Sequence, residues 1–91
     1  MKKKMVFDFD DESKERKISY SMPDEGACLD VDFGDDQACI YGNRKSFKTL
    51  AEIFSILASC DYPHGFHIHL RKDLSFDASD PDVLRIVVKN S

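Results

Sequence analysis

Residues 46–60, SFKTLAEIFSILASC, carry the three- and four-residue apolar spacing of an amphipathic helix. The stripe consists of Phe47, Leu50, Ala51, Phe54, Leu57 and Ala58, and it is widened by Ile53 and Ile56. Ser46 is a suitable N-cap, and Pro63 stops the helix a few residues beyond its last turn. Only Lys48 and Glu52 place charge on the opposite side, so we expect a sheet to cover most of this helix.

Alternating apolar and polar residues predict strands on both sides of the helix. The expected strands are residues 5–9, 18–22, 27–33, 36–41, 66–70 and 83–89. Polar loops at residues 11–15 and 71–82 and a turn at residues 23–26 separate them. The order β-β-β-β-α-β-β predicts one α+β domain over residues 1–91. We expect a mainly antiparallel sheet of about five to six strands with one amphipathic helix packed on one face. The other face is left to water or to a partner.

The turn at residues 34–35 sets the expected pairing of the two central strands. A two-residue Gly-Asp connection fits a type II′ hairpin. This register places Leu29 opposite Ile40 on the core face. It also places Val31 opposite Ala38. A loop one residue longer would turn the second strand over, so that register remains an alternative.

The segment from residue 18 through residue 43 contains no Lys or Arg. Its six carboxylates are Asp24, Glu25, Asp30, Asp32, Asp35 and Asp36. The segment charge of −6 exceeds the −4 of the whole chain. Such a concentration of like charge favours an opposite-sign partner or a cation, although solvated surfaces also carry acidic runs.

Length and composition narrow the classes of function. At 91 residues the chain holds one core, and a functional site must be shallow or shared with a partner. The 42% hydrophobic and 33% charged residues are typical of a globular protein. No stretch approaches the roughly 20 apolar residues of a membrane helix, so we expect no membrane span. After the lysines at residues 2–4, the carboxylates Asp8, Asp10, Asp11 and Glu12 interrupt any apolar stretch, so we expect no signal peptide and a cytoplasmic protein.

Enzymatic and nucleic-acid-binding roles have little support in the sequence. Cys28, Cys39 and Cys60 show no CxxC spacing and no neighbouring cation, and we interpret them as reduced, part-buried residues. No phosphate-binding loop, nucleophile motif or HExxH pattern occurs, so we expect no enzyme. The net negative charge of the chain and the dispersion of its basic residues disfavour nucleic-acid binding.

Two histidines suggest a metal hypothesis. His67 and His69 are two residues apart on an expected strand, so both imidazoles project from one face. Asp30 and Asp32 repeat this spacing on another strand. If the two strands were neighbours, two nitrogens and two oxygens could hold zinc or another divalent transition ion. The alternative is a pair of ordinary surface histidines with no cofactor.

Three short runs resemble a known family. They are residues 38–43 (ACIYGN), residues 50–53 (LAEI) with 57–58 (LA), and residues 65–70 (GFHIHL). Their order resembles the small immunity proteins of bacterial polymorphic toxin systems, in particular the immunity protein 32 type. The resemblance covers residues 37–89, and the loop at 71–73 departs from the acidic ending expected there. It implies a protein that binds and blocks a co-encoded toxin and performs no chemistry of its own.

The acidic segment agrees with this implication, because toxins that attack nucleic acid are usually basic. We therefore expect a partner-binding surface, with Tyr41 as an aromatic anchor. Its residues are Asp30, Asp32, Asp35, Asp36 and Tyr41. The alternatives are a small metal-binding module that uses His67 and His69, or a homo-oligomeric interaction domain, and a binding protein could itself be a homodimer.

Overall fold

The computed structural model describes residues 1–23, 25–75 and 81–90. These residues contain a short 3-10 helix, one α-helix and four strands: η1 (Ser13–Glu15), β1 (Leu29–Phe33), β2 (Ala38–Gly42), α1 (Arg44–Ser59), β3 (His67–Arg71) and β4 (Asp82–Val87). The fold is therefore α+β. None of the described helices has the length and apolar character needed to cross a membrane.

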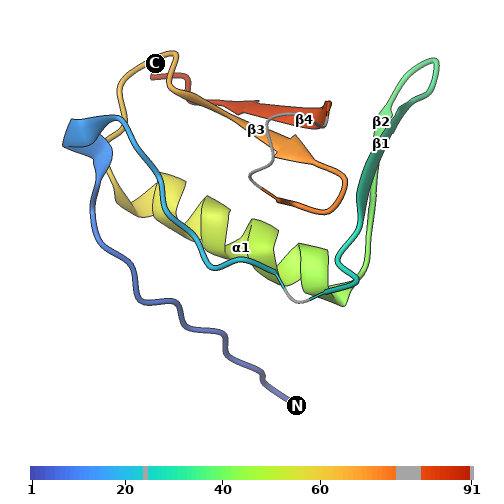
Figure 1. The fold of residues 1–91 in the computed structure, drawn as a ribbon, viewed down its shortest axis with the longest axis horizontal. Helices are drawn as coiled ribbons and strands as arrows, with labels where there is room; N and C mark the ends of the chain where they lie inside the picture. The colour runs from blue at the N-terminus through green and yellow to red at the C-terminus, as the bar shows by residue number, and fades with distance from the viewer. Residues whose placement is uncertain (24, 76–80, 91) are drawn as a thin grey trace.

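The strands form two antiparallel pairs, β1 with β2 and β3 with β4. The pair β3–β4 lies over α1, and the β1–β2 hairpin stands at the N-terminal end of that helix and projects to one side (Figure 1). A hydrogen bond from the Leu29 N–H to the Lys72 carbonyl, 2.6 Å long, joins the base of the hairpin to the turn after β3. In the described ranges, four strands in two small sheets thus replace the expected sheet of five to six strands.

The core forms where α1, the base of the hairpin and the β3–β4 pair meet. Its buried members are Leu29, Leu50, Ile53, Ile68, Leu70 and Leu74. Leu74 falls in a stretch that the sequence predicts to be a polar loop. It adopts φ +61° directly after the turn that follows β3, and this places its side chain in the core with no exposed surface.

The buried face of α1 is rotated from the expected one. Phe47 and Phe54, both assigned to the apolar stripe, are about half exposed, at 47% and 48%. Glu52, expected in solvent, is only 8% exposed. The helix begins earlier than expected because Asn43, rather than Ser46, is the N-cap, and its side chain accepts a hydrogen bond from the Ser46 N–H.

The two expected N-terminal strands are absent from the described residues. An alternating sequence forms a strand only when another strand satisfies its backbone groups. Residues 5–9 and 18–22 have no such partner strand and therefore form no ladder. Helix and loop side chains bind the N-terminal segment (residues 1–23) instead. The Ser21 N–H donates to Glu52 Oε1 at 2.6 Å, and the Tyr62 hydroxyl donates to the Lys17 carbonyl at 2.8 Å.

The remaining predictions have mixed outcomes. The helix, the histidine strand and the last strand appear within a few residues of their expected bounds. All three cysteines are free, but Cys28 is exposed rather than part-buried. Position 24 of the expected turn and positions 76–80 of the expected loop lie outside the described residues.

Candidate functional site

The β1–β2 hairpin (residues 29–42) holds all five residues expected to bind a partner. Its register differs from the predicted one, because Val31 faces Ile40 and Leu29 faces Gly42. The connection therefore has four residues, 34–37, and is closed by a bond from the Gly34 N–H to the Gln37 carbonyl. The shift is two residues, so it preserves the division of side chains between the two faces.

One face of the hairpin is acidic. Asp30 lies opposite Tyr41, and Asp32 lies opposite Cys39, so both carboxylates share a face with the tyrosine ring. Tyr41 is 57% exposed, and both aspartates are exposed. Asp35 and Asp36 lie in the exposed connection at the tip. Among the described residues, no ion pair involves any of these four carboxylates.

The opposite face of the hairpin is apolar and largely uncovered. The sequence assigned Val31 and Ile40 to the core, but only the base of the hairpin reaches it, where Leu29 is buried. Ile40 is 48% exposed, and Phe33, near the tip, is 77% exposed. The prediction failed because alternation identifies the apolar face of a strand without showing how far the strand extends past the core.

The close approach of the hairpin to α1 depends on Gly42. A Cβ atom at this position would lie 2.5 Å from Ser46 Oγ and 3.0 Å from the Phe47 ring. Ser46 is fully buried, and its hydroxyl donates to the Asn43 carbonyl at 2.8 Å. Only glycine leaves room for this packing, which sets the position of the hairpin against the helix.

The four-residue metal site, a hypothesis that required the two strands to be neighbours, does not form in the described residues. His67 and His69 do share a face of β3, and their ring centroids are 5.1 Å apart. However, β3 pairs with β4, so Asp30 and Asp32 belong to the other sheet. Within the described ranges, no group of three or more His, Cys, Asp or Glu side chains is arranged to hold a metal ion.

His69 has a different partner. Its Nδ1 lies 3.2 Å from Asp82 Oδ2 on β4. The hydrogen bond from His69 lowers the pKa of the Asp82 carboxyl below its ordinary value. This pair links the two strands on the surface of their sheet.

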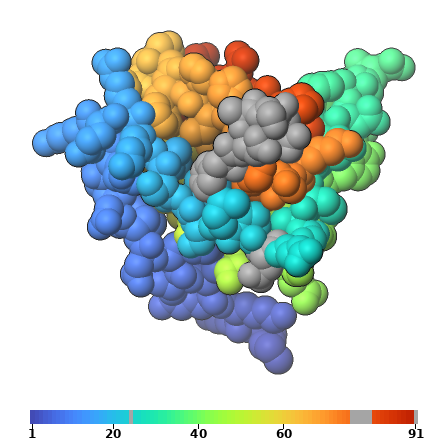
Figure 2. All heavy atoms as spheres, viewed as in Figure 1, coloured from blue at the N-terminus to red at the C-terminus, as the bar shows by residue number. Residues whose placement is uncertain are grey.

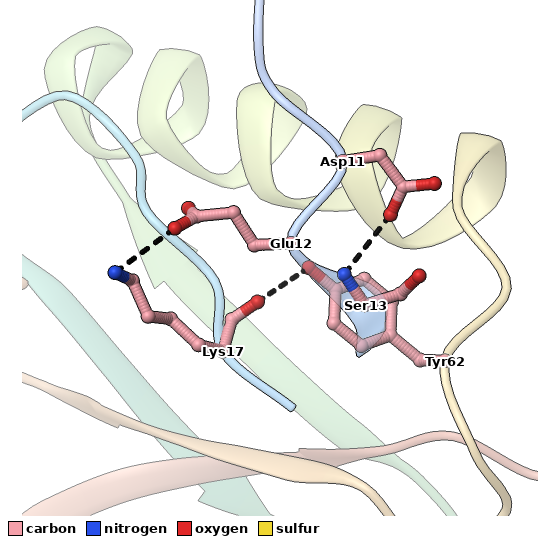
Figure 3. A network of polar contacts seen from close by, with 5 residues as sticks. All are labelled: Asp11, Glu12, Ser13, Lys17 and Tyr62. Atoms are coloured by element: carbon pink, nitrogen blue, oxygen red, sulfur yellow. Dashed lines mark hydrogen bonds and ion pairs between the residues drawn. The ribbon is translucent and has the colours of Figure 1, made fainter. Parts of the chain in front are cut away.

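A second polar network attaches the N-terminal segment to the loop after α1 (Figure 3). Glu12 forms an ion pair with Lys17 at 3.1 Å, and Asp11 accepts a hydrogen bond from the Ser13 N–H at 2.9 Å. The side-chain hydrogen bond with Ser13 contributes most to lowering the pKa of Asp11. Burial raises the pKa of Tyr62, whose hydroxyl donates to the Lys17 carbonyl.

Comparisons with family models, curated proteins and solved structures found no match to this chain. The functional argument therefore rests on the surfaces described above.

Proposed function

We propose that this chain is an immunity protein that neutralises a co-encoded, basic toxin by binding it through the acidic face of the β1–β2 hairpin. The observation that carries the proposal is the arrangement of Asp30, Asp32, Asp35 and Asp36. All four carboxylates are exposed on a hairpin that projects from the rest of the fold (Figure 1). The resemblance to immunity proteins given above supports the same reading.

The charges of the hairpin favour a cationic protein partner. Residues 18–43 contain no Lys or Arg, so the hairpin supplies no compensating cation of its own. Concentrated charge of one sign on a projecting element attracts an oppositely charged surface and accelerates association. A row of carboxylates also resembles the phosphates that a nuclease-like toxin would bind.

Tyr41 adds a contact of another kind. Its ring lies on the acidic face opposite Asp30 and is more than half exposed. Tyrosine is enriched among the residues that carry most of the binding energy at protein interfaces, because it combines a large apolar ring with a hydroxyl. In the proposed complex the carboxylates guide association and the ring anchors it, while the bound hairpin blocks the toxin sterically.

The test begins with coexpression of this chain and the polypeptide encoded immediately beside it, followed by size-exclusion chromatography with mass detection. The proposal expects co-elution that weakens as salt is raised. Separate elution of two folded proteins would refute it. A doubled mass for this chain together with separate elution of the neighbour would favour the homo-oligomeric alternative, for which the exposed Phe33 and Ile40 offer a surface.

Charge reversal then tests which face is used. The variant Asp30→Lys/Asp32→Lys should slow association by about tenfold or more at low salt and reduce its salt dependence. The matched control, Asp8→Lys/Asp10→Lys, makes the same change in net charge on the N-terminal segment and should have a much smaller effect. Equal association rates for the two variants would exclude the hairpin from the interface.

A further inference from the structure

A cavity of about 380 Å³ opens where the N-terminal segment meets the loop between α1 and β3. It is lined by Arg16, Pro63, His64, Gly65, Phe66 and His67. Figure 1 places these segments, the 3-10 turn and the start of β3, at the end of the molecule away from the hairpin, and Figure 2 shows them side by side. We refer to this cavity as the Arg16 pocket.

The walls of the Arg16 pocket are tied to one another. Arg16 follows η1 with φ +54°, and the next residue, Lys17, accepts the hydrogen bond from the Tyr62 hydroxyl. The Tyr62 ring stacks on Phe66, with centroids 4.4 Å apart and an angle of 24° between the ring planes. Tyr62 is 2% exposed and therefore links both walls from inside the fold. The backbone beside Arg16 and the Phe66 wall are therefore held in place, which lowers the ordering cost of binding.

The two histidines of the pocket offer different hydrogen-bonding groups. His64 Nδ1 accepts a bond from the Asn90 N–H at 3.1 Å, so the proton of its neutral ring is on Nε2. His67 Nδ1 lies 3.1 Å from the Gly65 carbonyl, to which it must donate, so its neutral ring keeps a lone pair on Nε2. The pair thus supplies one donor and one acceptor.

Arg16 supplies the charge. Its guanidinium carries five N–H donors, and no carboxylate within the described part of the chain forms an ion pair with it. No Asp or Glu side chain contributes to the described lining of the pocket either. The described lining of the pocket therefore carries one formal positive charge and no negative one, in a chain whose net charge is −4.

We propose that the Arg16 pocket binds the phosphoryl group of a small phosphate monoester. A phosphoryl group carries about −1.5 to −2 charges near neutral pH and has three terminal oxygens. Arginine can bind two of these oxygens with its planar fork, and His64 can donate to a third. The singly protonated form of the group also has a P–OH that can donate to His67, a bond that a carboxylate could not make.

The size and the apolar part of the lining indicate an ester rather than free phosphate. The volume of the pocket falls at the lower end of the range for small-molecule sites, about 300–1,000 Å³, and exceeds what one phosphoryl group fills. Pro63 and Phe66 offer apolar surface for an attached organic group. The pocket shares no residue with the acidic hairpin, so this inference is independent of the proposed immunity function.

The test is a titration of the ¹⁵N-labelled chain followed by NMR at constant pH and ionic strength. The probes are ribose 5-phosphate, inorganic phosphate and acetate. The inference expects saturable shifts at the amides of residues 64–67 with ribose 5-phosphate, weaker binding of inorganic phosphate and no saturable response to acetate. Equal or tighter binding of inorganic phosphate would overturn the assignment to an ester. A saturable acetate response of similar strength would overturn the assignment to a phosphoryl group.

The variant Arg16→Gln tests the site directly. It keeps a polar, non-glycine side chain at the positive φ and removes the charge, so the rest of the spectrum should remain unchanged. Affinity for ribose 5-phosphate should fall about tenfold or more. The matched control, Arg44→Gln, changes an exposed arginine at the start of α1 and should bind as the unmodified chain does. Equal affinities in the two variants, or shifts that grow linearly without saturation, would overturn the inference.

Discussion

Replacing Glu52 by Ala should detach part of the N-terminal segment from the helix. Glu52 is 8% exposed, and its two carboxylate oxygens accept bonds from the Ser21 N–H at 2.6 Å and the Ser21 hydroxyl at 3.3 Å. A hydrogen bond to a charged group contributes about 1.5–3 kcal/mol. The gain in helix propensity from Ala is a few tenths of a kcal/mol. Asp8, Asp10 and Glu12 line the same hollow, so the variant also loses their repulsion with Glu52, which offsets a further part of the lost stability.

The net expectation is a loss of about 2 kcal/mol in the free energy of unfolding, from a total on the order of 5–15 kcal/mol. Urea unfolding followed by circular dichroism measures this loss. Trypsin cleavage after Lys14, Arg16 and Lys17 reports separately on release of the N-terminal segment, and it should become faster in the variant.

Two control variants define the source of this effect. Glu52→Gln keeps an acceptor for the Ser21 N–H and should lose less than half as much stability. Lys48→Ala changes an exposed position of the same helix and should be close to neutral. An unchanged urea midpoint together with an unchanged cleavage rate in Glu52→Ala would refute the reasoning, because the segment would then be held by other contacts.

Two further predictions concern the hairpin base and the β3–β4 surface. Gly42→Ala should reduce the free energy of unfolding by about 1–3 kcal/mol in urea titrations, since the new methyl group would collide with Ser46 Oγ and the Phe47 ring. The pKa of Asp82 is lower in the folded chain, chiefly through its bond to His69, so its stabilisation is complete near neutral pH and is lost as the pH falls below about 4. Asp82→Asn should therefore show a smaller drop in thermal midpoint between about pH 5 and pH 2.

For each of these two predictions, one measured outcome would contradict it. Gly34→Ala is the control for Gly42→Ala, because the nearest atom to its new Cβ, the Gln37 carbonyl oxygen, is 3.4 Å away. Similar urea midpoints for the two alanine variants would remove the proposed collision. For Asp82→Asn, an acid-side decline as steep as that of the unmodified chain would show that the pair with His69 does not contribute.

Local periodicity was sufficient to predict α1, β3 and β4, since each is identified by its own residues. The helical spacing of residues 46–60 and the alternation at residues 66–70 do not depend on distant parts of the chain. Local periodicity was not sufficient to predict the buried face of the helix. It depends on what packs against it, and the N-terminal segment, which covers Glu52, was expected to be a pair of strands.

Other features depend on tertiary contacts that periodicity does not encode. Leu74 enters the core only because the turn after β3 gives it a positive φ, and nothing in its polar surroundings indicates this. The candidate surface was predicted in part, because the even shift in register kept Asp30, Asp32 and Tyr41 on one face. The Arg16 pocket was missed, since residues 16 and 67 meet only after the N-terminal segment has docked.

The position of Tyr62 has a consequence for the order of folding. Its hydroxyl bonds to residue 17, which is 45 positions earlier in the chain, and its carbonyl accepts a bond from the side chain of residue 90, which is 28 positions later. Forming a contact between distant residues costs loop-closure entropy before the contact can stabilise the fold. During synthesis, the N-terminal segment leaves the ribosome well before the tyrosine that binds it. The bond from Tyr62 to this segment therefore forms only after α1 and the following loop have been made, whereas the bonds from Ser21 to Glu52 need only α1.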